Sequence, residues 1–284
     1  MGAIGSQVAR HLVEDSDCVL LLGGFLTDID SGLYTMRIPD ANLVLADAAH
    51  VRVQGEVYED ISMTDLIRSL LLSPNLKARD LSIPKADTKE PRSLGKDLTS
   101  ETVIEELNRH MSDEITAVAD VGDCLFSCLD LHVNRFIAPA FYASMGFGVP
   151  AGVGAGLADS SRRPLVLVGD GALQMTGTEL CTARKLGQNP IVIVFNDGYY
   201  GTLRAIGPEL RSFELPEWDY AGMAKALGCD GSSASNREEL HDSLEAGFES
   251  KVPYVVDTKI TGRPSALLQR IGELISKKTS PNPT

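Results

Sequence analysis

The chain has 284 residues, 43% of them hydrophobic, which is enough for one large globular core or two modest ones. A net charge of −13 argues against a nucleic-acid-binding surface, and no apolar run is long enough to cross a membrane or to form the core of a signal peptide. The five cysteines are odd in number and lie mostly in apolar or helical surroundings, so they favour a cytoplasmic protein with free thiols over a disulfide framework.

The first part of the chain alternates helical and strand patterns. CVLLLGGF is a continuous apolar run that ends at a glycine pair, which is typical of a buried parallel strand. Two further strands and two amphipathic helices are expected around it. The predicted helices are 4–13 and 61–72, and the predicted strands are 18–25, 42–47 and 51–58. Together they make about half of a doubly wound α/β domain.

A charged stretch that contains three prolines and has no periodicity separates this part from the rest. Such a composition indicates an exposed linker. We therefore divide the chain into a partial α/β domain at 1–75, a linker at 76–98 and a complete α/β domain at 99–284.

The second domain has a regular alternation of elements. The helix patterns are 101–112 with Ser100 as N-cap, 141–158, 176–187, 218–228, 236–250 and 265–275, and the strand patterns are 116–122, 163–171, 190–198 and 253–260. This order predicts a parallel sheet with helices on both faces. Ligands then bind at the carboxyl ends of the strands.

Two oxygen-bearing side chains follow neighbouring apolar strands. Asp170 lies in a Gly-Asp-Gly triplet, and Asn196 ends the next strand pattern. A carboxylate, an amide oxygen and a backbone carbonyl suit Mg²⁺, which takes further oxygens from a phosphate. Gly169 and Gly171 allow close approach of an anion, and the amides of Gly171, Ala172 and Leu173 can donate to it. The pattern predicts a magnesium diphosphate site; the alternative is a tight turn without a ligand.

This stretch resembles the thiamine diphosphate-dependent enzymes. With GGFLTDID (23–30), ADVGDCLF (119–126) and FYASMGFGVPAG (141–152), it is similar to the indolepyruvate and phenylpyruvate decarboxylases, which are related to pyruvate decarboxylase. The resemblance covers residues 8–275 and implies thiamine diphosphate and Mg²⁺ as cofactors. It implies that Asp170 and Asn196 bind the metal through their side chains and Gly198 through its carbonyl.

The same resemblance implies further cofactor contacts. Gly122, Asp123 and Cys124 match a segment that touches the cofactor in that family. Met145 matches the apolar side chain that wedges beneath the cofactor and bends it, and the carbonyl of Ala143 is expected to accept from the aminopyrimidine. Alternative interpretations are a helix N-cap for Asp123 and a core methionine for Met145.

The chain departs from the family in two places. The family's essential glutamate lies in an N-terminal domain that is not present here, so we expect a fragment that covers the C-terminal portion; a separate chain that supplies this domain is the alternative. We expect the isolated chain to bind the diphosphate weakly and to show no appreciable activity. A second glutamate of the pyruvate decarboxylases is replaced by Thr202. Asp28 is a candidate for the missing proton donor, with a plain turn residue as the alternative.

The expected function is non-oxidative decarboxylation of a bulky 2-oxo acid, such as indolepyruvate or phenylpyruvate, to an aldehyde. A carboligase of the acetolactate synthase type and a catalytically inactive homologue are the alternatives. The resemblance implies a homo-oligomer, a dimer or tetramer, formed through the cofactor domain. No nucleic acid or membrane partner is expected. Candidate lining residues of the substrate pocket are Phe126, Met145, Tyr199, Leu203 and the helix at 265–275.

Overall fold

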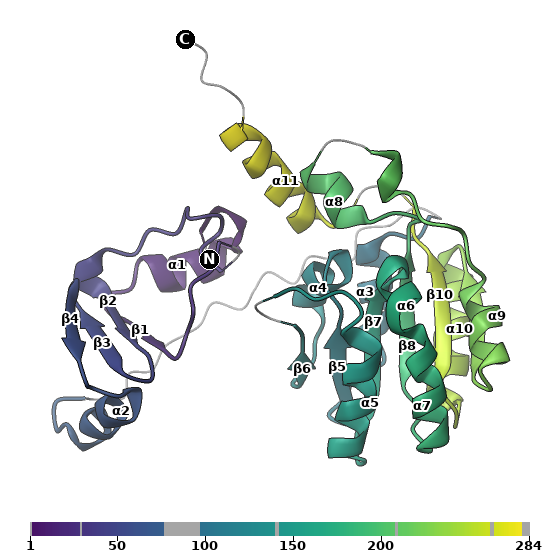
Figure 1. Ribbon diagram of the computed structural model, residues 1–284, viewed down its shortest axis with the longest axis horizontal. Helices are drawn as coiled ribbons and strands as arrows, with labels where there is room; N and C mark the ends of the chain where they lie inside the picture. Colours follow the sequence, from purple (N-terminus) through teal and green to yellow (C-terminus); the bar gives the residue numbers. More distant parts are fainter. Residues whose placement is uncertain are drawn as a thin grey trace, which may run out of the picture. The chain divides into compact units, whose positions relative to one another are not determined.

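The computed structural model describes residues 2–28, 30–76, 97–139, 142–207, 210–261 and 264–279. The chain divides into two compact units, Met1–Glu90 and Pro91–Thr284, each with its own sheet (Figure 1). The division falls inside the predicted linker, most of which lies outside the described residues. Both units combine a sheet with helices, and strands and helices alternate along most of the second unit, which confirms the predicted α/β class.

The first unit holds a four-stranded sheet in the order β1-β2-β3-β4. β1 (Val19–Leu22) and β2 (Leu43–Ala46) are parallel, whereas β3 (His50–Val53) and β4 (Glu56–Glu59) add antiparallel pairs. The helices are α1 (Gln7–Glu14) and α2 (Met63–Leu72), with short 3₁₀ turns at Gly2–Ile4 and Asp40–Asn42. The hydroxyls of Ser6 and Ser62 cap the two α-helices.

The single strand expected over 51–58 is wrong, because this stretch forms a hairpin. Gln54 and Gly55 both have positive φ, 52° and 86°, and they reverse the chain between β3 and β4. Two consecutive residues with positive φ are the geometry of a type I′ turn. The first sheet is therefore mixed.

The second unit holds a six-stranded sheet in the order β6-β5-β7-β8-β10-β9, and all five pairings are parallel. The strands are β5 (Ile115–Ala119), β6 (Phe136–Ile137), β7 (Arg163–Gly169), β8 (Ile191–Asn196), β9 (Asp230–Ala234) and β10 (Tyr254–Lys259). Gly169 pairs with Phe195, and Lys259 pairs with Asn196. The carboxyl ends of β7, β8 and β10 therefore lie side by side at one edge of the sheet.

Helices cover both faces of this sheet, because successive strand residues point to opposite sides. Leu165 and Leu167 belong to one hydrophobic cluster, and Val166 and Val168 to the other. Helices α3 (Ser100–Leu107), α4 (Asp123–Ser127) and α10 (Arg237–Glu249) contribute to the first cluster. Helices α5 (Gly148–Ala158), α6 (Asp170–Thr176), α7 (Leu180–Lys185) and α9 (Tyr220–Ala226) contribute to the second.

Two helices lie beyond the strand ends. α8 (Gly201–Ile206) and α11 (Ala266–Thr279) pack against each other (Figure 1). Their backbones approach closely, since a Cβ on Gly272 would stand 2.2 Å from the carbonyl oxygen of Ala205. Short 3₁₀ turns complete the unit at Cys128–Asp130, Gly177–Glu179 and Arg211–Phe213.

Several predicted boundaries differ from the structure. The helix expected over 141–158 begins only at Gly148, because Asp120 accepts the amides of Gly146 and Gly148 and holds the preceding residues in a turn. The cap of α3 is Thr99, whose hydroxyl accepts from the amide of Thr102, whereas Ser100 is the first helical residue.

The described residues also include the cysteines and the helices that bear on redox state and on membrane insertion. All five cysteines are free thiols, and three of them are buried. None of the described helices combines the length and the apolar character that a membrane span requires.

Candidate functional site at the strand ends

The candidate site lies where the helix connections change sides of the second sheet. The helix that follows β5 packs on one face, and the helix that follows β7 packs on the other. Ligands of open α/β sheets bind outside the carboxyl ends of the strands at such a switch point. The candidate ligand-binding residues are therefore those that directly follow β5, β7 and β8.

Asp170 is a buried carboxylate at the end of β7. It is 2% exposed, and its oxygens accept the backbone amides of Gly171 (2.7 Å) and Gly198 (2.8 Å). Burial and then the neighbouring carboxylate of Asp197 raise the pKa of Asp170 to about 7. Among the described residues no Lys, Arg or His forms an ion pair with Asp170. This carboxylate is therefore placed to gain from a bound cation.

Asn196 ends β8, the neighbouring strand of the sheet. Its side-chain nitrogen donates to Asp257 Oδ1 at 2.8 Å. In the described part of the chain no donor reaches Asn196 Oδ1, so this oxygen is available to a ligand. The parallel register of β7 and β8 brings the ends of the two strands together, as the sequence predicted.

Glycines leave room beside these groups. A Cβ on Gly169 or on Gly198 would meet nothing within 4 Å, and Gly198 has a φ of 72° that a side chain would strain. The amide of Gly198 binds Asp170, while its carbonyl accepts from Leu215 at 2.9 Å. A carbonyl oxygen has a second lone pair, so this bond does not prevent the predicted metal contact.

The predicted anion cradle is only partly available in the structure. The amide of Gly171 already donates to Asp170, and a Cβ there would stand 2.6 Å from the Tyr200 ring. Ala172 and Leu173 lie in the first turn of α6, where amides have no partner within the helix, and their side chains are buried in the core. The structure thus leaves these two amides as the open donors of the predicted set.

The donor set fits a hard cation. It consists of one carboxylate, one amide oxygen and one backbone carbonyl, which are the ligand types that Mg²⁺ accepts. The described residues hold no cluster of three or more His, Cys, Asp or Glu, so a site for zinc or another metal that prefers such ligands is not formed. The negative charge around Asp170 and the open space at its glycines support the same assignment.

The side chains of the segment after β5 have partners within the fold. Gly122 has a φ of 92° and precedes α4. The carboxylate of Asp123 accepts from the Ser100 hydroxyl and from the Ser265 amide at 2.8 Å, so it joins three helices. The Cys124 thiol is fully buried, and burial raises its pKa well above the ordinary value. The side chains of Asp123 and Cys124 are thus engaged in the fold, and the contacts of Gly122, Asp123 and Cys124 with the cofactor stay a prediction.

The turn that contains Ala143 and Met145 has a constrained backbone. Ala143 has a φ of 49°, which is uncommon for a residue with a side chain, and Met145 is 38% exposed. An exposed position argues against the alternative of a core methionine. The buried carboxylate of Asp120 holds the following residues, since it accepts the amides of Gly148 (2.7 Å) and Gly146 (3.3 Å). The Thr176 hydroxyl also donates to the Gly146 carbonyl at 2.8 Å.

Thr202 and the candidate proton donor Asp28 lie in different units. Thr202 lies beside the site, because a Cβ on Gly122 would be 3.0 Å from its hydroxyl oxygen. Asp28 is an exposed residue of the first unit, and its carbonyl accepts from Leu33 and from the Ser31 hydroxyl. Its role as a proton donor stays a prediction.

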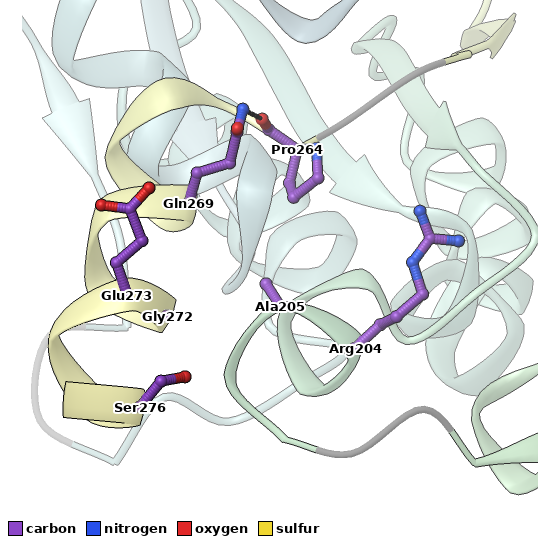
Figure 2. A pocket seen from close by; sticks show the side chains of 7 residues that line it. All are labelled: Arg204, Ala205, Pro264, Gln269, Gly272, Glu273 and Ser276. Atoms are coloured by element: carbon purple, nitrogen blue, oxygen red, sulfur yellow. Dashed lines mark hydrogen bonds between the residues drawn. The ribbon is translucent and has the colours of Figure 1, made fainter. Parts of the chain in front are cut away.

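Two hollows of the second unit border this region. One of about 670 Å³ lies between α8 and α11 and is lined by Arg204, Ala205, Pro264, Gln269, Gly272, Glu273 and Ser276 (Figure 2). It includes part of the predicted lining helix, whereas Phe126, Met145, Tyr199 and Leu203 do not line it. The other, of about 430 Å³, is lined by Glu217, Trp218, Asp219, Ser233, Asp257 and Lys259.

Three carboxylates were missed by the sequence reasoning. Asp120 directly follows β5, so the strand-end argument that selected Asp170 also applies to it. Asp197 follows Asn196, and burial raises its pKa. Asp257 lies inside β10 and is 1% exposed, and a lone carboxylate in an apolar strand was the available signal.

Comparisons with known proteins agree with this geometry. Residues 120–258 match the family model of the C-terminal TPP-binding domain of thiamine pyrophosphate enzymes. The chain is 35% identical over 256 residues to the indole-3-pyruvate decarboxylase of Azospirillum brasilense, covering 88% of this chain and 47% of that protein. It is 28% identical to an alpha-keto-acid decarboxylase of Mycobacterium leprae (strain TN), covering 87% of this chain and 45% of the relative. It is also 26% identical to one of Mycobacterium ulcerans (strain Agy99), covering 96% and 51%.

The chain thus spans about half the length of the curated relatives that it matches. The matched segment begins at Asp120 and contains Asp170, Asn196 and Asp257. These matches identify residues 120–258 as a C-terminal TPP-binding domain of the thiamine pyrophosphate enzymes, in a chain that is similar to 2-oxo acid decarboxylases.

Proposed function

We propose that this chain forms the cofactor-binding part of an enzyme that removes CO₂ from a bulky 2-oxo acid, such as indolepyruvate or phenylpyruvate, and releases an aldehyde. The observation that supports this most is the buried Asp170 carboxylate, which has no cationic partner among the described residues and lies at the same sheet edge as Asn196. The names of the relatives, indole-3-pyruvate decarboxylase and alpha-keto-acid decarboxylase, support the substrate class.

In this proposal the strand ends hold Mg²⁺ and the diphosphate. Asp170 and Asn196 Oδ1 bind the metal with the Gly198 carbonyl, and the amides of Ala172 and Leu173 donate to the phosphate oxygens. When bound, thiamine diphosphate supplies an electron sink for the carbon–carbon bond that breaks.

Other residues of the chain orient the cofactor. Asp120 and Thr176 fix the turn at Gly146, so that Met145 is presented on a rigid segment. The left-handed backbone of Ala143 in the same segment is a strained conformation of the kind that clusters at functional sites. We propose that Met145 would support the bound cofactor and that the Ala143 carbonyl would accept from its aminopyrimidine. Thr202 is expected beside the reacting atoms, and the proton donor remains Asp28 in this proposal.

We also propose a cytoplasmic enzyme that acts as a dimer or tetramer through the cofactor domain. The test uses the enzyme purified from its native source with phenylpyruvate, indolepyruvate and pyruvate, with and without Mg²⁺ and thiamine diphosphate. CO₂ and the matching aldehyde, formed only with both cofactors, are the expected products. Conversion of pyruvate to acetolactate without acetaldehyde would contradict the proposal in favour of a carboligase. The absence of both turnover and magnesium-dependent cofactor binding would instead indicate an inactive homologue.

A further inference from the structure

We propose that Asp257 is a positioning residue that fixes which atom of the Asn196 side chain faces the metal site. This inference rests on the proposed metal site and extends it to a residue on a third strand. Asp257 lies inside β10, next to β8 in the sheet, and it is not one of the proposed ligands.

The two ends of the Asn196 amide differ chemically. One end is an acceptor oxygen and the other is an NH₂ donor, so the group binds a cation only when the oxygen faces it. The two ends are similar in size, and packing alone selects weakly between the two orientations. A hydrogen-bond acceptor on the side of the amide away from the metal site would fix the orientation by binding the Asn196 side-chain nitrogen.

Asp257 provides that hold. Its Oδ1 accepts from Asn196 Nδ2 at 2.8 Å, and an ionised carboxylate can only accept hydrogen bonds. If the amide turned over, its oxygen would face the carboxylate oxygen at the same distance, so a charge-assisted hydrogen bond would be replaced by repulsion. The orientation with Oδ1 directed away from Asp257 is therefore strongly favoured.

The carboxylate itself is fixed in place. Asp257 is 1% exposed, and its second oxygen lies 3.0 Å from Lys259 Nζ, with the Ser233 hydroxyl at 3.4 Å. Lys259 pairs with Asn196 in the sheet register, so all three residues lie at one end of β8 and β10. A buried, ion-paired carboxylate has little freedom to move, and its hydrogen bond sets the amide rather than the reverse.

Residues that hydrogen-bond to metal ligands commonly affect metal affinity almost as much as the ligands themselves. Their replacement typically weakens metal binding by about 10- to 100-fold. We expect Asp257→Asn to fall in this range, because the new amide can meet Asn196 in either orientation and no longer excludes the unproductive one. Lys259→Met should cause a smaller loss, because it loosens Asp257 but leaves its charge in place.

The experiment titrates Mg²⁺ by calorimetry into the 284-residue chain in the presence of thiamine diphosphate. Glu217→Gln is the matched control, because it removes one carboxylate from the exposed lining of the hollow that Asp257 also lines. We expect a loss of at least about tenfold for Asp257→Asn and none for Glu217→Gln. Thermal unfolding without metal, compared among the variants, reports whether the fold is retained.

An exchange of the two residues separates positioning from a general structural role. In Asn196→Asp/Asp257→Asn the net charge is unchanged, and the hydrogen bond re-forms with donor and acceptor exchanged, which leaves a carboxylate oxygen facing the metal. The exchange also removes the ion pair with Lys259. Recovery of most of the lost Mg²⁺ affinity supports positioning, whereas a loss as large as that of Asp257→Asn would overturn it in favour of the ion pair.

Two other outcomes distinguish a failure of this inference from a failure of the proposed metal site. If the unaltered chain binds Mg²⁺ with thiamine diphosphate and Asp257→Asn binds it equally well, the inference is wrong and the proposed function stands. If the unaltered chain shows no magnesium-dependent binding, the proposed metal site is wrong, and the inference falls with it.

Discussion

Replacing Asp120 tests how firmly the fold holds the turn that presents Met145. Asp120 is fully buried, and its carboxylate accepts the amides of Val121 (2.8 Å), Gly146 (3.3 Å) and Gly148 (2.7 Å). Asp120→Ala leaves the two buried glycine amides without an acceptor, at a cost of about 1–3 kcal/mol each.

Burial of the carboxylate offsets part of this loss. It raises the pKa of Asp120, which shows that the ionised form is held at some cost. We therefore expect the free energy of unfolding to fall by about 3 kcal/mol, within the range for a buried hydrogen-bonded group.

Urea denaturation at neutral pH measures the change in the free energy of unfolding, and hydrogen exchange at Gly146 and Gly148 locates it. Exchange should accelerate at these two amides first, because they lose their acceptor. Asp159→Ala is the control, since Asp159 is half-buried in a surface turn, where it accepts from Ser161 and pairs with Arg162, and it should cost at most about 1 kcal/mol. An Asp120→Ala protein as stable as the unaltered one would refute the reasoning.

Two further predictions concern packing and pH. In α5, Gly152→Ala should destabilise the protein by about 1–3 kcal/mol, because the new Cβ would stand 2.4 Å from Val166 Cγ2. Gly154→Ala in the same helix meets nothing within 4 Å and should stabilise it by about 0.5–1 kcal/mol; equal effects in urea denaturation would contradict this packing. The His110 ring stacks on Phe248 at 4.6 Å between ring centroids, and burial lowers its pKa. The neutral ring therefore contributes stability above its ordinary pKa of 6.5, and this contribution is lost as the pH falls below that value. His110→Gln should flatten the fall in thermal stability between about pH 6.5 and 5, and an unchanged pH profile would argue against this origin.

The adjacency of the two proposed metal ligands was predictable because it depends on local patterns. Asp170 and Asn196 each end an apolar run, and parallel strands bring such ends to one edge. The partner of Asn196 was not predictable in the same way. Asp257 reaches it because β10 lies next to β8, and the order of strands in a sheet depends on packing over the whole domain.

The other differences have separate causes. The hairpin at Gln54–Gly55 lacks the Asn-Gly or Asp-Gly pair that predicts a type I′ turn from sequence. β9, with the sequence DGSSA, has no apolar alternation and was missed; it is an edge strand held by its parallel pairing with β10. The turn before α5 depends on Asp120, a residue distant in sequence, so the glycine- and alanine-rich pattern alone favoured a longer helix.

The most direct test of the metal site is a crystal structure of the chain with thiamine diphosphate and Mn²⁺ in place of Mg²⁺. The manganese can be located by its anomalous scattering. We expect one peak at a coordination distance of about 2.0–2.3 Å from an Asp170 carboxylate oxygen, Asn196 Oδ1 and the Gly198 carbonyl. A peak bound only by diphosphate oxygens, or located away from the ends of β7 and β8, would contradict it.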